Sequence, residues 1–377
     1  MKTIDLLLAT RYNNIGYIYC KLENTEQALH YIQKALDYTR SLPSNIPLIS
    51  RIFCNLTVTY EQSENYSKSE FYWKKGLEHH LQSMPNNTDA TASLFQAVAI
   101  TLADHQKYAE SIEYLKRSLT ICKNQEQILL FSCYKHLATA YNGLKEFQTA
   151  DKYLQKAIEI AHTLSSIDLS PIYVDSGNNH YQAQNYQQAL LSYGKALEFS
   201  QLHNNLSTHL KIFIVYTIQN ESTHALNYYE HNIRSRLAEM TVNDQIMTYY
   251  YIGVNYYDVK NNDKALKYFK KAQELILSDK SNTSFNSFLV DIFKKTGIIL
   301  FKMGQWSEVG AYYTRLLDYQ PTAETYLNIG LVHFKQENFH IALESLQKAS
   351  ELAKTTGALS ILAVATQYIE LCRKTLT

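Results

Sequence analysis

The chain has 377 residues, of which only 11 are Gly and 5 are Pro. This scarcity of turn residues argues against an all-β or Rossmann-like fold. The 36 basic and 35 acidic side chains leave a net charge of +1. No global field would therefore draw the protein to nucleic acid or to an anionic membrane, and we expect neither as a partner.

Targeting and redox signals point to a cytoplasmic protein. The apolar runs fall short of the ~20 residues that a membrane span needs, and the segment from Met1 to Asp5 lacks the layout of a signal peptide. The cysteines are scattered and form no CxxC pair, which favours reduced, individually buried thiols. They are Cys20, Cys54, Cys122, Cys133 and Cys372.

One sequence block recurs along the whole chain at spacings of roughly 33 to 44 residues. Its clearest copy runs from Tyr326 to Ala349, with a small residue at Gly330, an aromatic at Phe339 and alanines at Ala342 and Ala349. In chain order, we expect copies at residues 9–42, 50–84, 92–125, 131–164, 170–203, 206–239, 246–279, 290–322 and 323–356, followed by a capping helix at 358–376.

The small residue has a physical reason. Glycine in the middle of a helix costs roughly 1 kcal/mol relative to alanine, so its recurrence predicts that two helices pack closely there. Five glycines take this position: Gly16, Gly177, Gly253, Gly297 and Gly330. The sixth copy departs from the pattern, with Phe213 in place of the small residue, and we expect an irregular joint there.

This pattern resembles the tetratricopeptide repeat (TPR) family. The resemblance implies an all-α fold, a right-handed TPR superhelix (α-solenoid) of about nine helix-turn-helix repeats plus the capping helix, extending over residues 1–377 as a single solenoid. It also implies a module that binds a peptide or protein partner in a concave groove lined by the first helix of each repeat.

Motifs for chemistry are missing. The sequence contains no GxxxxGK[ST], GxGxxG, GxSxG or HExxH motif and no EF-hand loop. The 13 histidines show no metal-ligand spacing with a nearby cysteine or acid. We therefore expect no catalytic residues, no cofactor and no metal.

The family groove predicts which residues meet a ligand. Counted from the small residue, the positions three and two before it and one after it should point inward, and they are rich in amides, lysines and tyrosines. Amides suit the N–H and C=O groups of an extended peptide, and lysines suit carboxylates. The candidate binding residues are Asn13, Asn14, Tyr17, Asn55, Lys135, His136, Asp175, Asn178, Lys211, Tyr250, Tyr251, Lys294, Lys295 and Asn328. Asparagine is also common at these positions for structural reasons, so both interpretations stand.

Two functions follow. In the first, the chain is a peptide receptor similar to the peptide-sensing TPR domains of the Rap, NprR and PlcR quorum-sensing regulators. The repeats begin at once, so we expect neither the N-terminal helix-turn-helix nor the effector bundle of those regulators. In the second, the chain is a structural scaffold or oligomerising subunit, for which a homodimer through the terminal repeats is one arrangement.

Overall fold

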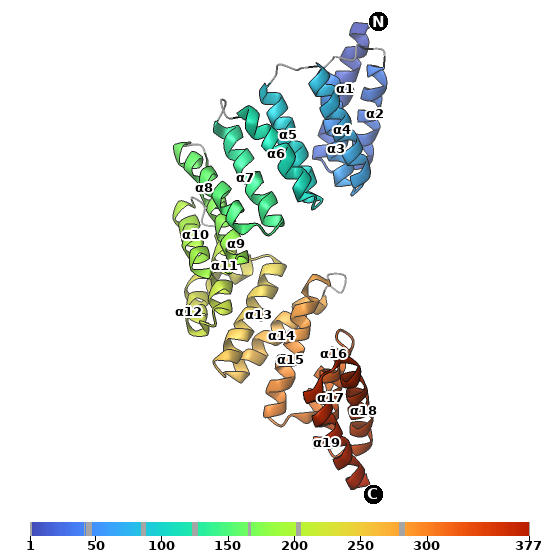
Figure 1. Cartoon of the computed structure of the whole chain (residues 1–377), viewed down its shortest axis with the longest axis vertical. Helices are drawn as coiled ribbons and strands as arrows, with labels where there is room; N and C mark the ends of the chain where they lie inside the picture. The colour runs from blue at the N-terminus through green and yellow to red at the C-terminus, as the bar shows by residue number, and fades with distance from the viewer. Residues whose placement is uncertain are drawn as a thin grey trace. The chain divides into compact units, whose positions relative to one another are not determined.

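A computed structural model describes residues 2–40, 42, 47–83, 88–122, 127–164, 167–200, 205–278 and 283–376. These residues form helices and loops, with no β-strand among them. The α-helices follow one another as nine hairpins and one final helix (Figure 1). The predicted all-α solenoid of about nine helical hairpins is therefore confirmed.

The chain divides into two compact units, Met1–Gln201 and Leu202–Thr377. The first unit contains five hairpins, whose helices are α1 (Lys2–Lys21), α2 (Thr25–Thr39), α3 (Pro47–Gln62), α4 (Tyr66–Ser83), α5 (Thr88–Asp104), α6 (Tyr108–Cys122), α7 (Gln127–Gly143), α8 (Phe147–Thr163), α9 (Ser170–Gln182) and α10 (Tyr186–Phe199).

The second unit contains the other four hairpins, two short 3-10 helices and the final helix. These elements are α11 (Leu206–Ile218), α12 (Ser222–Asn232), η1 (Arg234–Glu239), α13 (Val242–Asp258), α14 (Asn262–Ser278), η2 (Thr283–Phe285), α15 (Asn286–Lys302), α16 (Trp306–Leu317), α17 (Ala323–Lys335), α18 (Phe339–Thr356) and α19 (Leu359–Leu376). That the two units continue as one solenoid stays a prediction.

All nine hairpins turn in the same way. In each turn one residue adopts a positive φ, and the N–H of the next residue donates to the carbonyl five positions earlier, as Lys107 does to Leu102 at 2.8 Å and Glu146 to Tyr141 at 2.9 Å. This is the Schellman arrangement that ends a helix by satisfying its last carbonyls. The residues with positive φ are Glu23, Glu64, Gln106, Lys145, Gln184, Asn220, Lys260, Gly304 and Glu337.

The small residues let the two helices of a hairpin approach each other. A Cβ atom added to Gly253 would lie 2.5 Å from Cδ1 of Phe269, and one added to Gly330 would lie 2.6 Å from Cγ of Leu346. Phe269 and Leu346 are fully buried. The close packing predicted for these glycines is therefore confirmed, because a large side chain of the second helix occupies the space that glycine leaves open.

The sixth hairpin is irregular, as the sequence predicts. Phe213 is fully buried where the other hairpins carry a smaller side chain, and its ring lies 6.1 Å from that of Tyr229 on α12. Helix α12 is only 11 residues long and is followed by the 3-10 helix η1.

Each hairpin needs its neighbour to complete its core. Ala9 and Ile32 of the first hairpin share one buried cluster with Ile52 and Leu56 of α3. At the other end of the chain, Gly357 has a φ of 72° and ends α18. Helix α19 then packs Ala365, Ile369 and Cys372 against Leu346 and Ala349 of α18, which confirms the predicted capping helix.

An ionic link joins the second and third hairpins. The Glu70 carboxylate on α4 accepts hydrogen bonds from Lys107 in the α5–α6 turn and from Lys74, both at 2.6 Å. These two bonds, with Lys107 the stronger, lower the pKa of Glu70 to about 2. The link therefore requires an ionised carboxylate.

Gly253→Ala tests the close packing. In an open helix this change would stabilise by about 1 kcal/mol. At Gly253 the added methyl group meets the Phe269 ring, so we expect the free energy of unfolding to fall by about 1 to 3 kcal/mol. The matched control is Gly310→Ala on α16, whose added Cβ would lie an ordinary 3.8 Å from Val332 and should cost nothing. Urea unfolding followed by circular dichroism measures both, and equal stabilisation of the two variants would contradict close packing.

Glu70→Gln tests the ionic link through its pH dependence. Because the folded pKa lies below the usual 4.5, the carboxylate stabilises the fold above pH 4.5 and loses this effect as the pH falls towards 2. We expect Glu70→Gln to lower stability by about 1 kcal/mol at pH 7. The difference from the unmodified protein should shrink between pH 4.5 and 2 in thermal melts. Glu113→Gln, on the exposed side of α6, is the control at pH 7.

Candidate functional site

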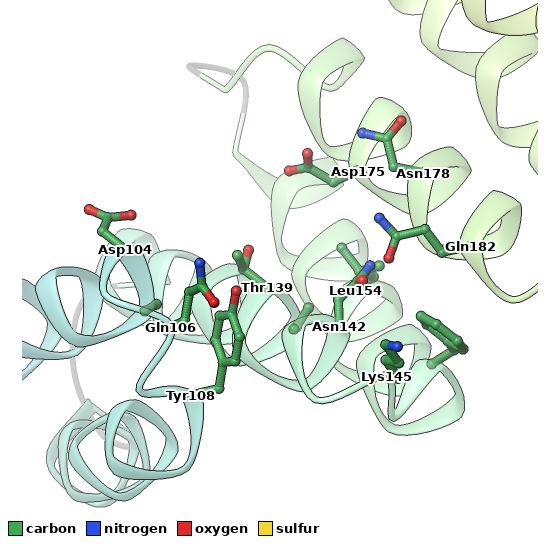
Figure 2. Close-up of a pocket in the computed structure, with 14 residues that line it drawn as sticks. Asp104, Gln106, Tyr108, Thr139, Asn142, Lys145, Leu154, Asp175, Asn178 and Gln182 are labelled. Carbon is green, nitrogen blue, oxygen red and sulfur yellow. The ribbon is translucent and has the colours of Figure 1, made fainter. Parts of the chain in front are cut away.

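A groove of about 960 Å³ lies along α5, α7 and α9, the first helices of three consecutive hairpins in the first unit. In Figure 2, Asp104, Gln106 and Tyr108 lie on one side, Asp175, Asn178 and Gln182 on the other, and Thr139 and Asn142 between them. The full lining is Ala103, Asp104, Gln106, Tyr108, Ala138, Thr139, Asn142, Gly143, Lys145, Phe147, Leu154, Asp175, Asn178 and Gln182.

The repeat geometry places these side chains. Thr139 on α7 and Asn178 on α9 each follow the small residue of their helix, Ala138 and Gly177, by one position. Asp104 and Gln182 lie one turn further along α5 and α9, just before the turn residues. Residues one turn apart share a helix face, so the groove uses the second half of each first helix.

Gly143 and Tyr108 shape the groove together. A Cβ atom added to Gly143 would collide with the ring of Tyr108, the first residue of α6. The ring therefore lies directly against the backbone at the end of α7. This contact supplies an aromatic wall beside a floor that carries the polar side chains of Thr139 and Asn142.

Hydrogen bonds orient two of the groove amides. The Tyr193 hydroxyl donates to Oδ1 of Asn178 at 2.9 Å, and Asn142 donates through Nδ2 to Oδ1 of Asn179 at 3.3 Å. These bonds leave the NH₂ group of Asn178 and the carbonyl oxygen of Asn142 for other partners. The groove thus offers both a hydrogen-bond donor and a hydrogen-bond acceptor from ordered side chains.

Charges surround this polar floor. Lys135 Nζ lies 3.6 Å from the Asp175 carboxylate, across the gap between α7 and α9. Burial lowers the pKa of the neighbouring His136, Lys135 lowers it further, and Asp104 opposes both effects. His136 is therefore neutral near pH 7, and the fixed charges of the region are those of its acids and lysines.

The predicted residues of the first unit fall into two places. Asp175 and Asn178 line the groove, and Lys135 contacts Asp175. Asn13 is only 2% exposed and accepts a 2.9 Å hydrogen bond from Asn55, so this amide pair joins the first two hairpins. Asn14 and Tyr17 are exposed on α1.

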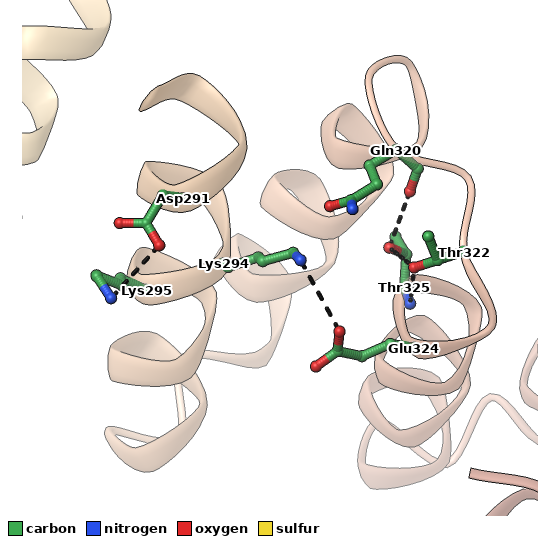
Figure 3. Close-up of polar contacts among 7 residues, drawn as sticks. All are labelled: Asp291, Lys294, Lys295, Gln320, Thr322, Glu324 and Thr325. Carbon is green, nitrogen blue, oxygen red and sulfur yellow. Dashed lines mark hydrogen bonds and ion pairs between the residues drawn. The ribbon is translucent and has the colours of Figure 1, made fainter. Parts of the chain in front are cut away.

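The predicted residues of the second unit lie in contacts within that unit. Tyr250 donates to the Asp291 carboxylate at 2.9 Å, and Lys295 lies 3.4 Å from the same carboxylate. Burial, followed by the charge of Asp291, raises the pKa of Tyr250. Lys294 lies 3.9 Å from Glu324 at the start of α17, where Thr325 donates to the Gln320 carbonyl (Figure 3).

The remaining three predicted residues of that unit are placed as follows. Lys211 donates to the Ser207 hydroxyl at 2.9 Å along α11. Tyr251 lies edge-on to Tyr250, with ring centroids 5.0 Å apart. Asn328 is half-buried on α17.

The sequence did not lead us to place six residues in the groove that line it: Asp104, Gln106, Tyr108, Asn142, Lys145 and Gln182. The periodicity of the helix could have identified three of them. Positions four and five residues after the small residue share a face with the position one after it. Extending the predicted inward positions by one turn would have included Asp104, Asn142 and Gln182.

Within the described residues, no group of three His, Cys, Asp or Glu side chains could hold a metal ion. All five cysteines are free thiols, and burial raises the pKa of Cys133 to about 12. Among the helices that the structure describes, none has the length and apolar character to cross a membrane.

Family comparison matches four of the hairpins. A model of the tetratricopeptide repeat matches residues 8–42, 130–168 and 322–356, and a second model of the same repeat matches residues 248–279. These segments overlap the hairpins α1–α2, α7–α8, α17–α18 and α13–α14. No curated protein sequence matches the chain.

Solved structures share the fold at low sequence identity. One is a signal transduction ATPase with numerous domains (STAND) from Pyrococcus horikoshii, which is described as having a tetratricopeptide repeat sensor. Its TM-score is 0.60 at 14% identity, and the match covers 94% of this chain and 55% of the ATPase chain. This chain thus spans about half the length of that protein. The apo form of RapI has a TM-score of 0.52 and 17% identity, covering 72% and 99%. Pseudomonas aeruginosa PilF has a TM-score of 0.45 and 16% identity, covering 64% and 96%.

Proposed function

Because the chain is a tetratricopeptide-repeat protein, we propose that it is a non-catalytic binding module that holds an extended peptide segment in the groove along α5, α7 and α9. The segment is either a free peptide or an exposed part of a partner protein. The repeats supply a rigid framework, and the groove side chains supply recognition.

The observation that carries this proposal is the set of amide and hydroxyl groups that α7 and α9, the first helices of two consecutive hairpins, present to one groove. An extended peptide presents unpaired N–H and C=O groups along its length. Thr139, Asn142, Asn178 and Gln182 offer donors and acceptors to both kinds of group. The Tyr108 ring and Phe147 add apolar surface for side chains of the ligand.

Two of the predicted residues become direct contacts in this proposal, Asp175 and Asn178. Lys135 adds a positive charge beside Asp175, and the neighbouring His136 is neutral near pH 7. The other predicted residues stay candidates for a longer ligand, with Asn14 and Tyr17 exposed on α1.

A narrower form of the proposal is that the ligand is a short bacterial signalling peptide. The resemblance of the repeats to peptide-sensing regulators suggests this class of ligand. The likeness to RapI supports the fold alone.

Thr139→Trp tests the groove directly. Thr139 is exposed, and its hydroxyl bonds only the Lys135 carbonyl one turn back, so a large side chain should fill the groove without disturbing the fold. Native mass spectrometry of protein purified from its own host identifies a retained peptide, and fluorescence anisotropy measures its affinity. We expect Thr139→Trp to weaken binding at least tenfold, about 1.4 kcal/mol.

Thr120→Trp is the matched control. Thr120 is also exposed and bonds a carbonyl of its own helix, Arg117, but it lies on α6 outside the groove lining. Its affinity should be unchanged. Equal affinities for the two variants would exclude this groove as the binding site.

A second candidate function is that of an oligomerising subunit, favoured by exposed apolar side chains on α1 and directly after it. Ile4, Leu7, Ile18 and Leu22 are 62%, 54%, 56% and 68% exposed. Large apolar side chains exposed together along one helix are a feature of protein-contact surfaces. On this reading, multi-angle light scattering should give a dimer mass that Ile18→Glu converts to a monomer mass, whereas a monomer at all concentrations would count against self-association.

A further inference from the structure

The charges along the groove are not evenly compensated. Its lining contains two carboxylates, Asp104 and Asp175, and one ammonium group, Lys145. Asp175 has Lys135 at 3.6 Å. Asp104 is exposed at the opposite side of the groove and has no ion-pair partner among the residues that the structure describes.

Nearby cationic groups do not neutralise Asp104. Lys107, three residues away, is held by the Glu70 carboxylate at 2.6 Å. His136 lies close enough to feel the charge of Asp104, but burial and Lys135 lower its pKa, so the imidazole is neutral near pH 7. Neither of these two groups therefore forms an ion pair with the Asp104 carboxylate.

Helix stability does not explain an acid at this position. Asp104 is the last residue of α5, where the negative end of the helix dipole makes a carboxylate unfavourable. Lys145, by contrast, follows the end of α7, where a cation is favourable. Lys145 can therefore be accounted for by local stability, and Asp104 cannot.

We propose that the groove recognises a cationic group of its peptide ligand, either a Lys or Arg side chain or a free N-terminus, at Asp104. This inference rests on the proposed function. The cation would relieve the unfavourable charge at the end of α5, while the amides of α7 and α9 bind the backbone beside it.

The experiment is selection from a random heptapeptide library by the full chain and by Asp104→Lys. The unmodified protein should enrich peptides that carry Lys or Arg. Asp104→Lys should lose that enrichment, select Asp or Glu in its place, and bind the cationic peptides roughly tenfold more weakly in anisotropy titrations. Glu113→Lys makes the same charge change on the exposed side of α6 and should select the same peptides as the unmodified protein.

Synthetic versions of an enriched peptide separate the two sources of the cation. If the N-terminus is the group, acetylation weakens binding and Lys→Gln or Arg→Gln does not. If a side chain is the group, the reverse holds, and either pattern supports the proposal when Asp104→Lys abolishes it.

The two proposals fail in different ways. Peptides that lack a cation, yet bind the unmodified chain and lose affinity with Thr139→Trp, would overturn the role of Asp104 and keep the groove. Selection of cationic peptides that is unchanged in Asp104→Lys would also overturn it. A library with no peptide sensitive to Thr139→Trp would overturn the proposed function, and the role of Asp104 with it.

Discussion

The close contact between the two helices of a hairpin is the constraint on which the other features depend. At Gly253 or Gly330 the first helix contributes no side chain to the contact, and Phe269 or Leu346 fills the space from the second helix. This contact sets the separation of the helices, and the Schellman turn sets where the second helix starts. With both defined, each hairpin presents the same faces to its neighbours, so the hairpins stack. The sixth hairpin, with Phe213 and Tyr229 both large, illustrates what changes when this contact is lost.

The groove is a consequence of that repetition. Thr139 and Asn178 both line the groove, because α7 and α9 are the first helices of consecutive hairpins and the two residues hold the same position on them. Side chains that differ between the repeats then give this groove its own contacts and charges. Gly143 admits the Tyr108 ring, the Lys135–Asp175 pair balances one carboxylate, and Asp104 is left with its charge. A uniform backbone with varied side chains suits the recognition of one particular extended segment.

Much of the fold could be predicted from the sequence because its determinants are local. Recurrent glycines, such as Gly253 and Gly330, and Gly357 after α18 mark close contacts and helix ends within a few residues of themselves. The groove was harder to predict, because the burial of an inward-facing side chain depends on the neighbouring hairpins. Asn13 takes a position that the family pattern directs inward, yet α3 covers it and Asn55 bonds it. The lack of an ion pair at Asp104 could not be predicted for the same reason, because Lys107 is paired with Glu70 of another hairpin.

The turns carry a further consequence. Eight of the nine hairpin-turn residues with positive φ are not glycine, although glycine would adopt that conformation without the roughly 1 kcal/mol of strain that other residues bear. Two of them, Gln106 and Lys145, line the groove. The turn backbone accepts acidic, basic and amide side chains there, so each hairpin has a rim position that can vary in charge without altering the stack. Ligand preference can thus diverge at the rim while the solenoid beneath it stays the same.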